Sequence, residues 1–492
     1  MKQHRSGIIR SLVFISLLIL SLLGINRVTR PKYDYSNSSW PTTSTYEQFY
    51  DMQRDSIDVL FLGSSVMVNA VSPQQIYRTY GIRSYNLGSE NQSPIISYYW
   101  LKEALRFQSP RAVVMDCRFL FSLHKENPLN MIEGLVRKSI DPMKWSSVKM
   151  QAVHDICTID EGQDELSYYL TNLRYHERWK VLTIDDYDTS MQRAPLKGFA
   201  PIYENGPETY EAFVPSDAGA MTEFDEHMGV YLDRITELCK EKGIRLILID
   251  LPGNQMNDAI NNLLTSYASE HDIDYLNYCE QSMYESIGAA LPEENTTAHA
   301  NLPGALKFSD AIGKYLQETC GIQSVPDEQY ESCDAYHEHS IRNDRLKKTD
   351  DLETYLSLLN DPAYTVFISV SEDAGADQNE KIRQLWSELG LQYSLQGMYE
   401  TGYTAVISDE GIYEEAGQSF LSHTAQFMNR HHTYTIESAG RSVGSWSSVR
   451  IDSTEYSRGT PGINIVVFDE MFSKVIDSVT YETYTGTFAR TE

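Results

Sequence analysis

Short apolar runs alternate with longer segments of helical periodicity in the first globular part of the chain. Helical patterns occupy Tyr98–Phe107 and Phe224–Lys242, and Gly243 follows the second one where a helix C-cap is expected. Strands that alternate with helices predict an α/β fold with a parallel sheet. The apolar runs predict strands at Asp58–Leu62, Ala112–Met115, Arg245–Leu251 and Tyr275–Tyr278.

The pattern changes near the C-terminus. An apolar strand at Tyr364–Val370 is followed by a helical pattern from Asn379 to Leu389, which Gly390 closes. Mixed strands with one or two helices indicate an α+β, sandwich-like domain. Later runs predict further strands at Tyr403–Ser408, Ser448–Asp452, Gly462–Asp469 and Lys474–Tyr484.

The segment between these two parts is polar and charged and lacks apolar periodicity, which predicts a linker over residues 326–350. Within it, His337-Glu338-His339 has no other ligand cluster nearby. We therefore expect solvated side chains there rather than a metal site. No other motif indicates a metal or a cofactor.

The N-terminus carries Lys2, Arg5 and Arg10 ahead of an apolar run from Ser11 to Ile25. This pattern is typical of a signal peptide or a short signal anchor. Because no Ala-x-Ala-like cleavage site follows, we expect an uncleaved, single-pass membrane anchor with the bulk of the chain outside the cell. The predicted domains are the anchor over 1–30, an α/β domain over 31–325, the linker over 326–350 and an α+β domain over 351–492.

Length and composition agree with more than one domain. The length of 492 residues exceeds what one core normally supports. The hydrophobic share of 41% is enough to form sizeable cores. Its 41 basic and 69 acidic residues give a formal charge of −28, so nucleic acid is an unfavourable partner and a neutral glycan is a better one. None of the six cysteines forms a Cys-x-x-Cys pair; Cys320 and Cys333 could close a disulfide, and most of the others are expected to be buried thiols.

Candidate chemistry follows the first strand. That strand runs into Gly63-Ser64-Ser65, and a candidate base, His299, lies far downstream just ahead of a helical pattern. A serine needs an imidazole to take its proton and backbone donors to hold the oxyanion. In open α/β sheets ligands bind at the carboxyl ends of the strands, where Ser65 stands. Alternatively, Gly63-Ser64-Ser65 is an ordinary turn in which serine caps the next helix.

These blocks resemble the SGNH (GDSL-like) hydrolases, in the branch of membrane-anchored proteins that handle acyl groups on bacterial cell-envelope polysaccharides. The resemblance rests on Gly63-Ser64-Ser65, on Asn86-Leu87-Gly88-Ser89 with Gln92-Ser93-Pro94, and on His299-Ala300-Asn301 with Gly304-Ala305 and Lys307. It implies a three-layer α/β fold with Ser65 as nucleophile, His299 as base, and Gly88 and Asn91 as oxyanion donors.

The chain departs from this family at two positions. Thr296 stands where the family has an aspartate, and Val66 stands where it usually has a histidine. Since a triad carboxylate fixes the imidazole tautomer, its loss lowers turnover strongly. Glu293 and Glu294 are near enough in sequence to replace it.

The C-terminal part resembles the ILEI/PANDER-like domain, which acts as a carbohydrate-binding module in a glycan-building transferase. The matching segments are 364–370, 402–409, 458–469 and 474–484. The resemblance implies glycan binding, for which the candidate contacts are Trp446, His431, His432, Tyr434 and Arg441.

Two hypotheses of different classes follow. In the first, the protein is an anchored serine esterase or O-acyltransferase that removes or transfers acyl groups, with acetyl the expected one, on an extracellular polysaccharide; an integral membrane acyltransferase is its partner if it transfers. In the second, the SGNH-like domain is catalytically impaired and the protein is a glycan-binding scaffold. A further cluster, Tyr175-His176-Glu177-Arg178-Trp179, is either a sugar site or a helix with one buried aromatic face.

Overall fold

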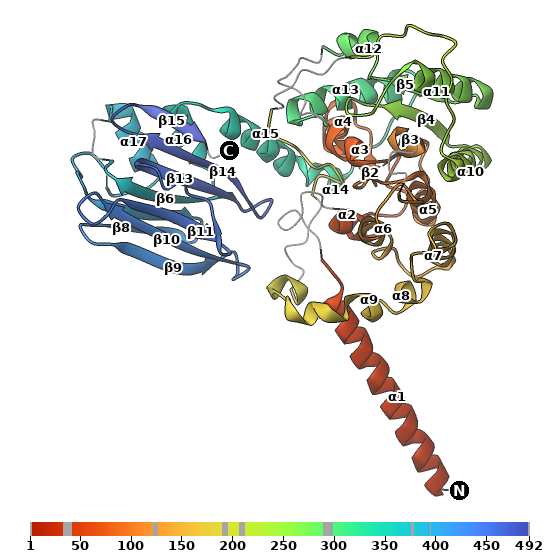
Figure 1. Cartoon of the computed structure of the whole chain (residues 1–492), viewed down its shortest axis with the longest axis horizontal. Helices are drawn as coiled ribbons and strands as arrows, with labels where there is room; N and C mark the ends of the chain where they lie inside the picture. The colour runs from red at the N-terminus through yellow and green to blue at the C-terminus, as the bar shows by residue number, and fades with distance from the viewer. Residues whose placement is uncertain are drawn as a thin grey trace. The chain divides into compact units, whose positions relative to one another are not determined.

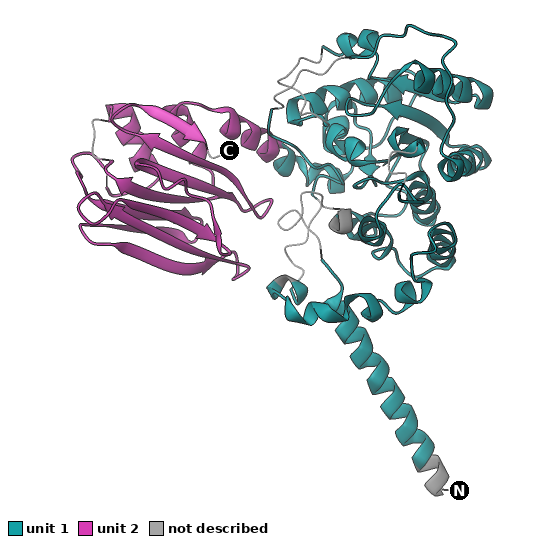
Figure 2. Ribbon diagram, in the orientation of Figure 1, with its two compact units in different colours: residues 1–337 teal, residues 338–492 magenta. Residues whose placement is uncertain are grey.

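The computed structural model describes residues 2–32, 42–121, 126–188, 195–205, 212–288, 299–374, 378–393 and 395–490. The chain divides into two compact units, residues 1–337 and residues 338–492 (Figure 2).

The first unit is built on a parallel sheet, in which the described strands follow the order β2-β1-β3-β4-β5 (Figure 1). Nearly all residues of β1, β3 and β4 are buried, as expected of a sheet covered on both faces. The four predicted strands are confirmed, and β2 is an addition. The strands are β1 (Val59–Leu62), β2 (Ser84–Asn86), β3 (Ala112–Asp116), β4 (Arg245–Asp250) and β5 (Asp274–Asn277).

Helices cover both faces of this sheet. Alternate strand residues such as Leu60, Val113 and Leu248 belong to one core with α5 (Pro94–Ala104), α7 (Ser147–Ile159) and α10 (Glu226–Lys242). The intervening strand residues point to the opposite face, because strand side chains alternate. There α3 (Ser65–Ala70), α4 (Pro73–Tyr80) and α13 (Leu302–Glu318) pack together. The predicted C-cap is confirmed, since Gly243 ends α10 in the left-handed conformation.

The remaining helices of the first unit are short, apart from α1 and α11. They are α1 (Lys2–Thr29), α2 (Thr42–Phe49), η1 (Arg118–Leu120), α6 (Glu133–Ile140), α8 (Glu165–Tyr169), α9 (Asn172–Tyr175), η2 (His176–Lys180), η3 (Ile184–Asp186), α11 (Asp258–His271), α12 (Gln281–Ser286) and α14 (Glu328–Glu331). Helix α1 contains an apolar stretch, Gly7–Thr29, of 23 residues with mean hydropathy 2.5 that the protein leaves exposed. This is consistent with a signal sequence or an anchor.

The second unit is dominated by one mixed sheet, in which ten strands are described. Strand β6 (Tyr364–Glu372) is central and pairs with β7, β10 and β13; Phe367 and Val466 lie in the core of one sheet face. The other strands are β7 (Gly402–Ser408), β8 (Gly411–Gly417), β9 (Leu421–Phe427), β10 (His432–Gly440), β11 (Trp446–Ile451), β12 (Thr454–Glu455), β13 (Gly462–Asp469), β14 (Lys474–Glu482) and β15 (Thr487–Arg490). Helices α16 (Leu352–Leu359) and α17 (Glu380–Glu388) accompany them.

The segment predicted as a linker, residues 326–350, is helical. This segment contains α14 and the helix α15 (Asp334–Lys348), and the boundary between the two units falls within α15. Its histidines are buried rather than solvated: His337 Nε2 lies 3.0 Å from Gln75 Oε1, and His339 Nε2 lies 3.0 Å from Asp469 Oδ1. The helix buries polar side chains through specific partners, so it shows no apolar period.

The cysteines are all free, so Cys320 and Cys333, which could have closed a disulfide, do not form one. The Cys333 sulfur instead lies 3.0 Å from the Lys197 ammonium nitrogen. Cys117, Cys239, Cys279 and Cys333 are buried, as expected of structural thiols. Among the described residues no group of His, Cys, Asp and Glu is arranged to hold a metal ion.

Candidate active site

The turn after β1 places Ser65 at the carboxyl edge of the sheet. Gly63 has a φ of +145°, and a Cβ at this position would lie 2.4 Å from the Asp116 Cβ, so only glycine fits. Ser64 is the N-cap of α3, and its Oγ accepts a hydrogen bond from the Val66 N–H at 3.3 Å. The capping interpretation therefore applies to Ser64, which leaves the Ser65 hydroxyl available for chemistry.

Ser65 and His299 come together although 234 positions separate them. His299 Nε2 lies 3.0 Å from Ser65 Oγ, a hydrogen-bonding distance. Asn301 holds the segment that carries His299: its Oδ1 caps α13 by accepting from the Gly304 N–H. Ser65 is 8% exposed, and His299 is half-buried.

The protonation state of His299 follows from its surroundings. Burial, with a smaller contribution from the Arg118 cation, lowers the pKa of His299 to about 4. At neutral pH the imidazole is therefore uncharged, and Nε2 can accept the serine proton in the tautomer that carries hydrogen on Nδ1. A triad carboxylate would raise this pKa. The predicted substitutes Glu293 and Glu294, like Thr296, lie outside the described residues.

A carboxylate that was not predicted from the sequence, Asp116, holds the serine turn. Asp116 ends β3, is buried, and accepts hydrogen bonds from both the N–H (3.1 Å) and the hydroxyl of Ser64. Its other oxygen accepts from Asn254 Nδ2 at 2.7 Å and from the Arg118 N–H at 3.2 Å. These bonds commit Asp116 to the turn. Its place at the carboxyl end of a predicted strand was the one available signal.

Asn254 also bridges Asp116 to a further buried acid. Asn254 Nδ2 donates to Asp250 Oδ1 at 2.6 Å, and the Tyr275 hydroxyl donates to Asp250 Oδ2 at 2.9 Å. Burial, followed by repulsion from Asp116, raises the pKa of Asp250 to about 7. Neither acid was predicted as a site residue.

The two predicted oxyanion donors have different positions. Gly88 packs against the serine turn, since a Cβ there would lie 3.0 Å from the Gly63 carbonyl oxygen. Its N–H donates to Asn86 Oδ1 at 3.0 Å. Asn91 lies in the turn that leads to α5 and has a φ of +49°. Both remain predicted donors.

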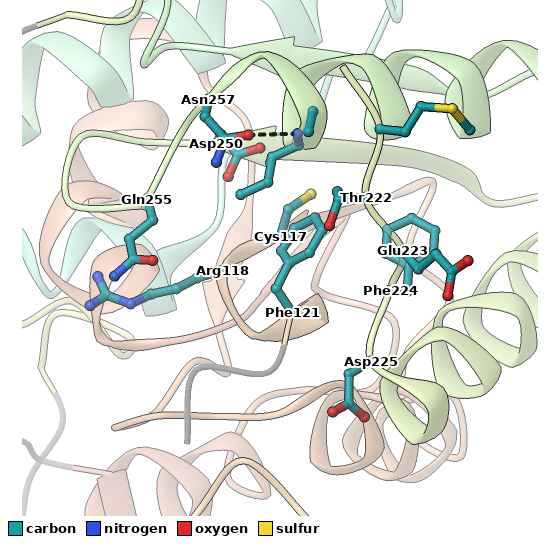
Figure 3. Close-up of a pocket in the computed structure, with 13 residues that line it drawn as sticks. Cys117, Arg118, Phe121, Thr222, Glu223, Phe224, Asp225, Asp250, Gln255 and Asn257 are labelled. Atoms are coloured by element: carbon teal, nitrogen blue, oxygen red, sulfur yellow. Dashed lines mark hydrogen bonds between the residues drawn. The ribbon is translucent and has the colours of Figure 1, made fainter. Parts of the chain in front are cut away.

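A cavity of about 380 Å³ opens at the carboxyl ends of β3 and β4 (Figure 3). Arg118 and Gln255 lie on one side of it, and the acidic Glu223 lies on the other. Aromatic surface comes from Phe121, whose ring centroid is 5.8 Å from that of Phe224. Arg118 links this polar cavity to the serine turn, because its N–H donates to Asp116, which also accepts from the Ser64 N–H.

The candidate sugar contacts predicted from the sequence differ in their exposure. In the C-terminal unit, Tyr434 and His431 are buried and Arg441 is exposed; His432 lies between Asp452 and Ser473. Trp446 is 47% exposed, and its indole N–H donates to Glu437 at 3.1 Å. The Tyr175–Trp179 cluster forms α9 and η2, which contact α1.

Comparisons with known proteins locate this chain only distantly. No protein-family model matches it, and no curated protein does. Among solved structures, it is similar to a proposed acylhydrolase from Bacteroides fragilis at 12% identity and a TM-score of 0.28, over 56% of this chain and 94% of that one. It is also similar to a GDSL-like lipase from Bacteroides thetaiotaomicron at 10% identity and a TM-score of 0.26, over 56% of this chain and 99% of that one.

Proposed function

We propose that this protein is a membrane-anchored, extracytoplasmic serine esterase or O-acyltransferase of the SGNH type. It acts on acyl groups, acetyl above all, of a cell-envelope or extracellular polysaccharide. The observation that carries the proposal is the 3.0 Å separation between Ser65 Oγ and His299 Nε2 at the carboxyl edge of the parallel sheet. The order of the SGNH-like sequence blocks supports the same reaction class.

In the proposed reaction, His299 Nε2 takes the Ser65 proton while Oγ attacks the acyl carbonyl carbon. The tetrahedral intermediate collapses, the ester C–O bond breaks, and the departing sugar oxygen takes the proton back from His299. Water or a second sugar hydroxyl, deprotonated by His299, then attacks the acyl carbon; the bond from that carbon to Ser65 Oγ breaks, and Oγ takes the proton back from His299. Water gives hydrolysis, whereas a sugar hydroxyl gives transfer, in which an integral membrane acyltransferase would supply the acyl group.

The cavity at the carboxyl ends of β3 and β4 suits an uncharged, hydroxyl-rich substrate. Arg118, Gln255 and Asn257 offer hydrogen-bonding groups, while Phe121 offers a ring face against which a pyranose can pack. The acidic Glu223 and Asp225 on its wall disfavour a polyanion. For the C-terminal unit, the resemblance to a carbohydrate-binding module and the exposed Trp446 support a glycan-holding role.

The test uses the full-length protein in detergent. We expect slow release of acetate from an activated acetyl ester and from acetylated glycans, and labelling of one serine by a fluorophosphonate. Ser65→Ala should reduce both to the level of buffer alone, because the Ser65 hydroxyl is the proposed nucleophile. Ser109→Ala is the matched control, since Ser109 is an exposed serine bonded only to Asp55 in the described contacts. An unlabelled parent protein, or an active Ser65→Ala variant, would refute the proposal.

The competing function is a glycan-binding scaffold with an impaired SGNH-like domain. It is favoured by the Gly88 N–H, which is already bonded to Asn86 Oδ1, and by Thr296 in place of the family aspartate. Parent protein that neither releases acetate nor takes the label, yet binds glycans, would establish the scaffold instead.

A further inference from the structure

The C-terminal end of α1 is bonded to the globular unit. Asn172 Nδ2 donates to the Leu22 carbonyl at 3.3 Å, and Thr29 Oγ1 donates to Asn172 Oδ1 at 3.1 Å. In η2, Arg178 donates to the Thr29 carbonyl at 2.9 Å. Helix α9 and η2 therefore lie beside the last two turns of α1 (Figure 1).

Charge strengthens this attachment. Arg178 is itself held by Asp186 at 2.9 Å, and the Lys32 ammonium donates to the Val28 carbonyl at 2.9 Å. Cations at a helix C-terminus satisfy carbonyls that have no partner within the helix and interact favourably with its dipole. The direction in which α1 leaves the unit is thus fixed by side chains of residues 171–186.

Residues 166–187, which include this segment, carry an unusual amount of exposed apolar side chain, with exposures between 39% and 67%. Isolated exposed apolar residues are ordinary, but a group of them in one short segment marks an interaction surface. We call these residues the collar: Leu166, Leu170, Leu173, Trp179, Val181, Ile184 and Tyr187.

The length of α1 indicates what covers the collar. At 1.5 Å per residue, the 23 residues of Gly7–Thr29 span about 34 Å, a little more than the ~30 Å hydrocarbon core of a bilayer. Asn172 is bonded to Leu22, which lies about 10 Å before the end of that span. When α1 crosses the membrane, the segment that begins at Asn172 therefore lies at the outer end of the hydrocarbon core, between the level of Leu22 and the headgroup boundary near Thr29.

We propose that the collar is inserted into that boundary, so that the first unit sits on the lipid surface instead of being tethered above it. The partner is the lipid bilayer itself. Trp179 and Tyr187 have the amphipathic rings that favour this depth, and Arg174 and Lys180 can reach the headgroups. The proposal rests on the retained anchor of the proposed function and is independent of catalysis.

The experiment places a fluorescent reporter in the collar of the full-length protein. Cys157 and Cys320, the partly exposed thiols, are replaced by serine, and Trp179→Cys is labelled with an environment-sensitive dye. The protein is reconstituted into vesicles of phosphatidylcholine and phosphatidylglycerol. We expect blue-shifted emission and strong quenching by a nitroxide on the upper acyl chain. Val230→Cys, an exposed apolar position on α10, is the matched control and should give water-like emission.

Flotation of the vesicles after alkaline carbonate separates the two ways of failing. Protein that does not float lacks the anchor, which overturns the anchor and the collar together. Protein that floats with water-like emission at position 179 overturns the collar alone. Emission that is blue-shifted but insensitive to lipid nitroxide shows that this chain or a second copy of it covers position 179, and also overturns the lipid proposal.

Discussion

At the scale of single residues, the site depends on two pKa changes of opposite sign. His299 is kept neutral by burial and, to a lesser extent, by Arg118, whereas Asp250 is kept protonated to about pH 7 by burial and by Asp116. Both changes follow from placing titratable groups where the sheet edge is dry. Neither is visible in the sequence, because each depends on neighbours that are remote along the chain.

Removing the Arg118 charge should move the pH profile. For kcat/KM on an activated ester, the acid limb reports His299 and should lie well below pH 6.5 in the parent protein. Arg118→Gln should move this limb to higher pH, by less than burial moves it down, since burial is the larger cause. Arg118→Lys keeps the charge and should leave the limb in place. A limb that does not respond to Arg118→Gln would mean that another group controls the rate.

Asp250→Asn should remove the loss of folding stability that ionisation of the buried Asp250 carboxyl causes. Because the pKa of Asp250 is about 7 in the folded state and 3.8 otherwise, the folded state binds more protons between these values, so stability falls as pH rises across this window. A tenfold difference in proton affinity between the two states corresponds to about 1.4 kcal/mol. Thermal unfolding should show Asp250→Asn gaining several degrees over the parent at pH 8 and none at pH 4. The exposed Asp51→Asn is the control, and equal gains at both pH values would contradict the assignment.

At the scale of elements, sequence patterns predict the strands that bury apolar side chains. They miss the elements that are short, half-exposed or held by hydrogen bonds between polar side chains. The strands β1, β3, β4 and β5 were predicted because their residues form apolar runs. Strand β2 has only three residues, Ser84–Asn86, and shows no such run. Strand β8 has no fully buried residue, and α15 buries histidine and asparagine through hydrogen bonds, so neither has a readable period.

The candidate site divides in the same way. Ser65 and His299 were found through motif order, but Asp116 was not, since its bonds to Ser64 join residues 52 positions apart. The reason that Asp116 was not predicted is physical. The burial of a residue can be inferred from the local apolar pattern of the sequence, whereas a hydrogen bond between two elements depends on the register at which they pack.

The connection between β3 and the serine turn makes Asp116 a positioning residue. Asp116→Asn has one acceptor oxygen, so it cannot serve both the Ser64 donors and Asn254. Hydrogen bonds to charged groups contribute about 1.5–3 kcal/mol, so kcat on an activated ester should fall about 10- to 100-fold with KM little changed. A lower melting temperature with unchanged kcat would show a purely structural role.

At the scale of the whole molecule, an acidic chain with a net charge of −28 carries its candidate chemistry in one unit and its candidate glycan contact in the other. The second unit contains none of the six cysteines, so its ten-stranded sheet is stabilised by packing and hydrogen bonds alone. Its outer polar surface around Trp446 includes Glu437, which also pairs with Arg450 at 3.2 Å. An aromatic face flanked by hydrogen-bonding groups is the arrangement that a sugar ring requires.

Trp446→Ala should therefore abolish glycan binding by the full-length protein while leaving its melting temperature unchanged, because the side chain is half exposed. The matched control is Phe420→Ala, which removes another half-exposed aromatic ring of the same unit and should bind like the parent. A glycan array identifies the ligand, and calorimetry then measures binding that is weak and nearly independent of salt, since an acidic protein releases no counterions from a neutral sugar. Parent protein that binds no saccharide would exclude the lectin role. Binding that survives Trp446→Ala would place the glycan elsewhere, either on another surface of this unit or in the cavity of the first unit.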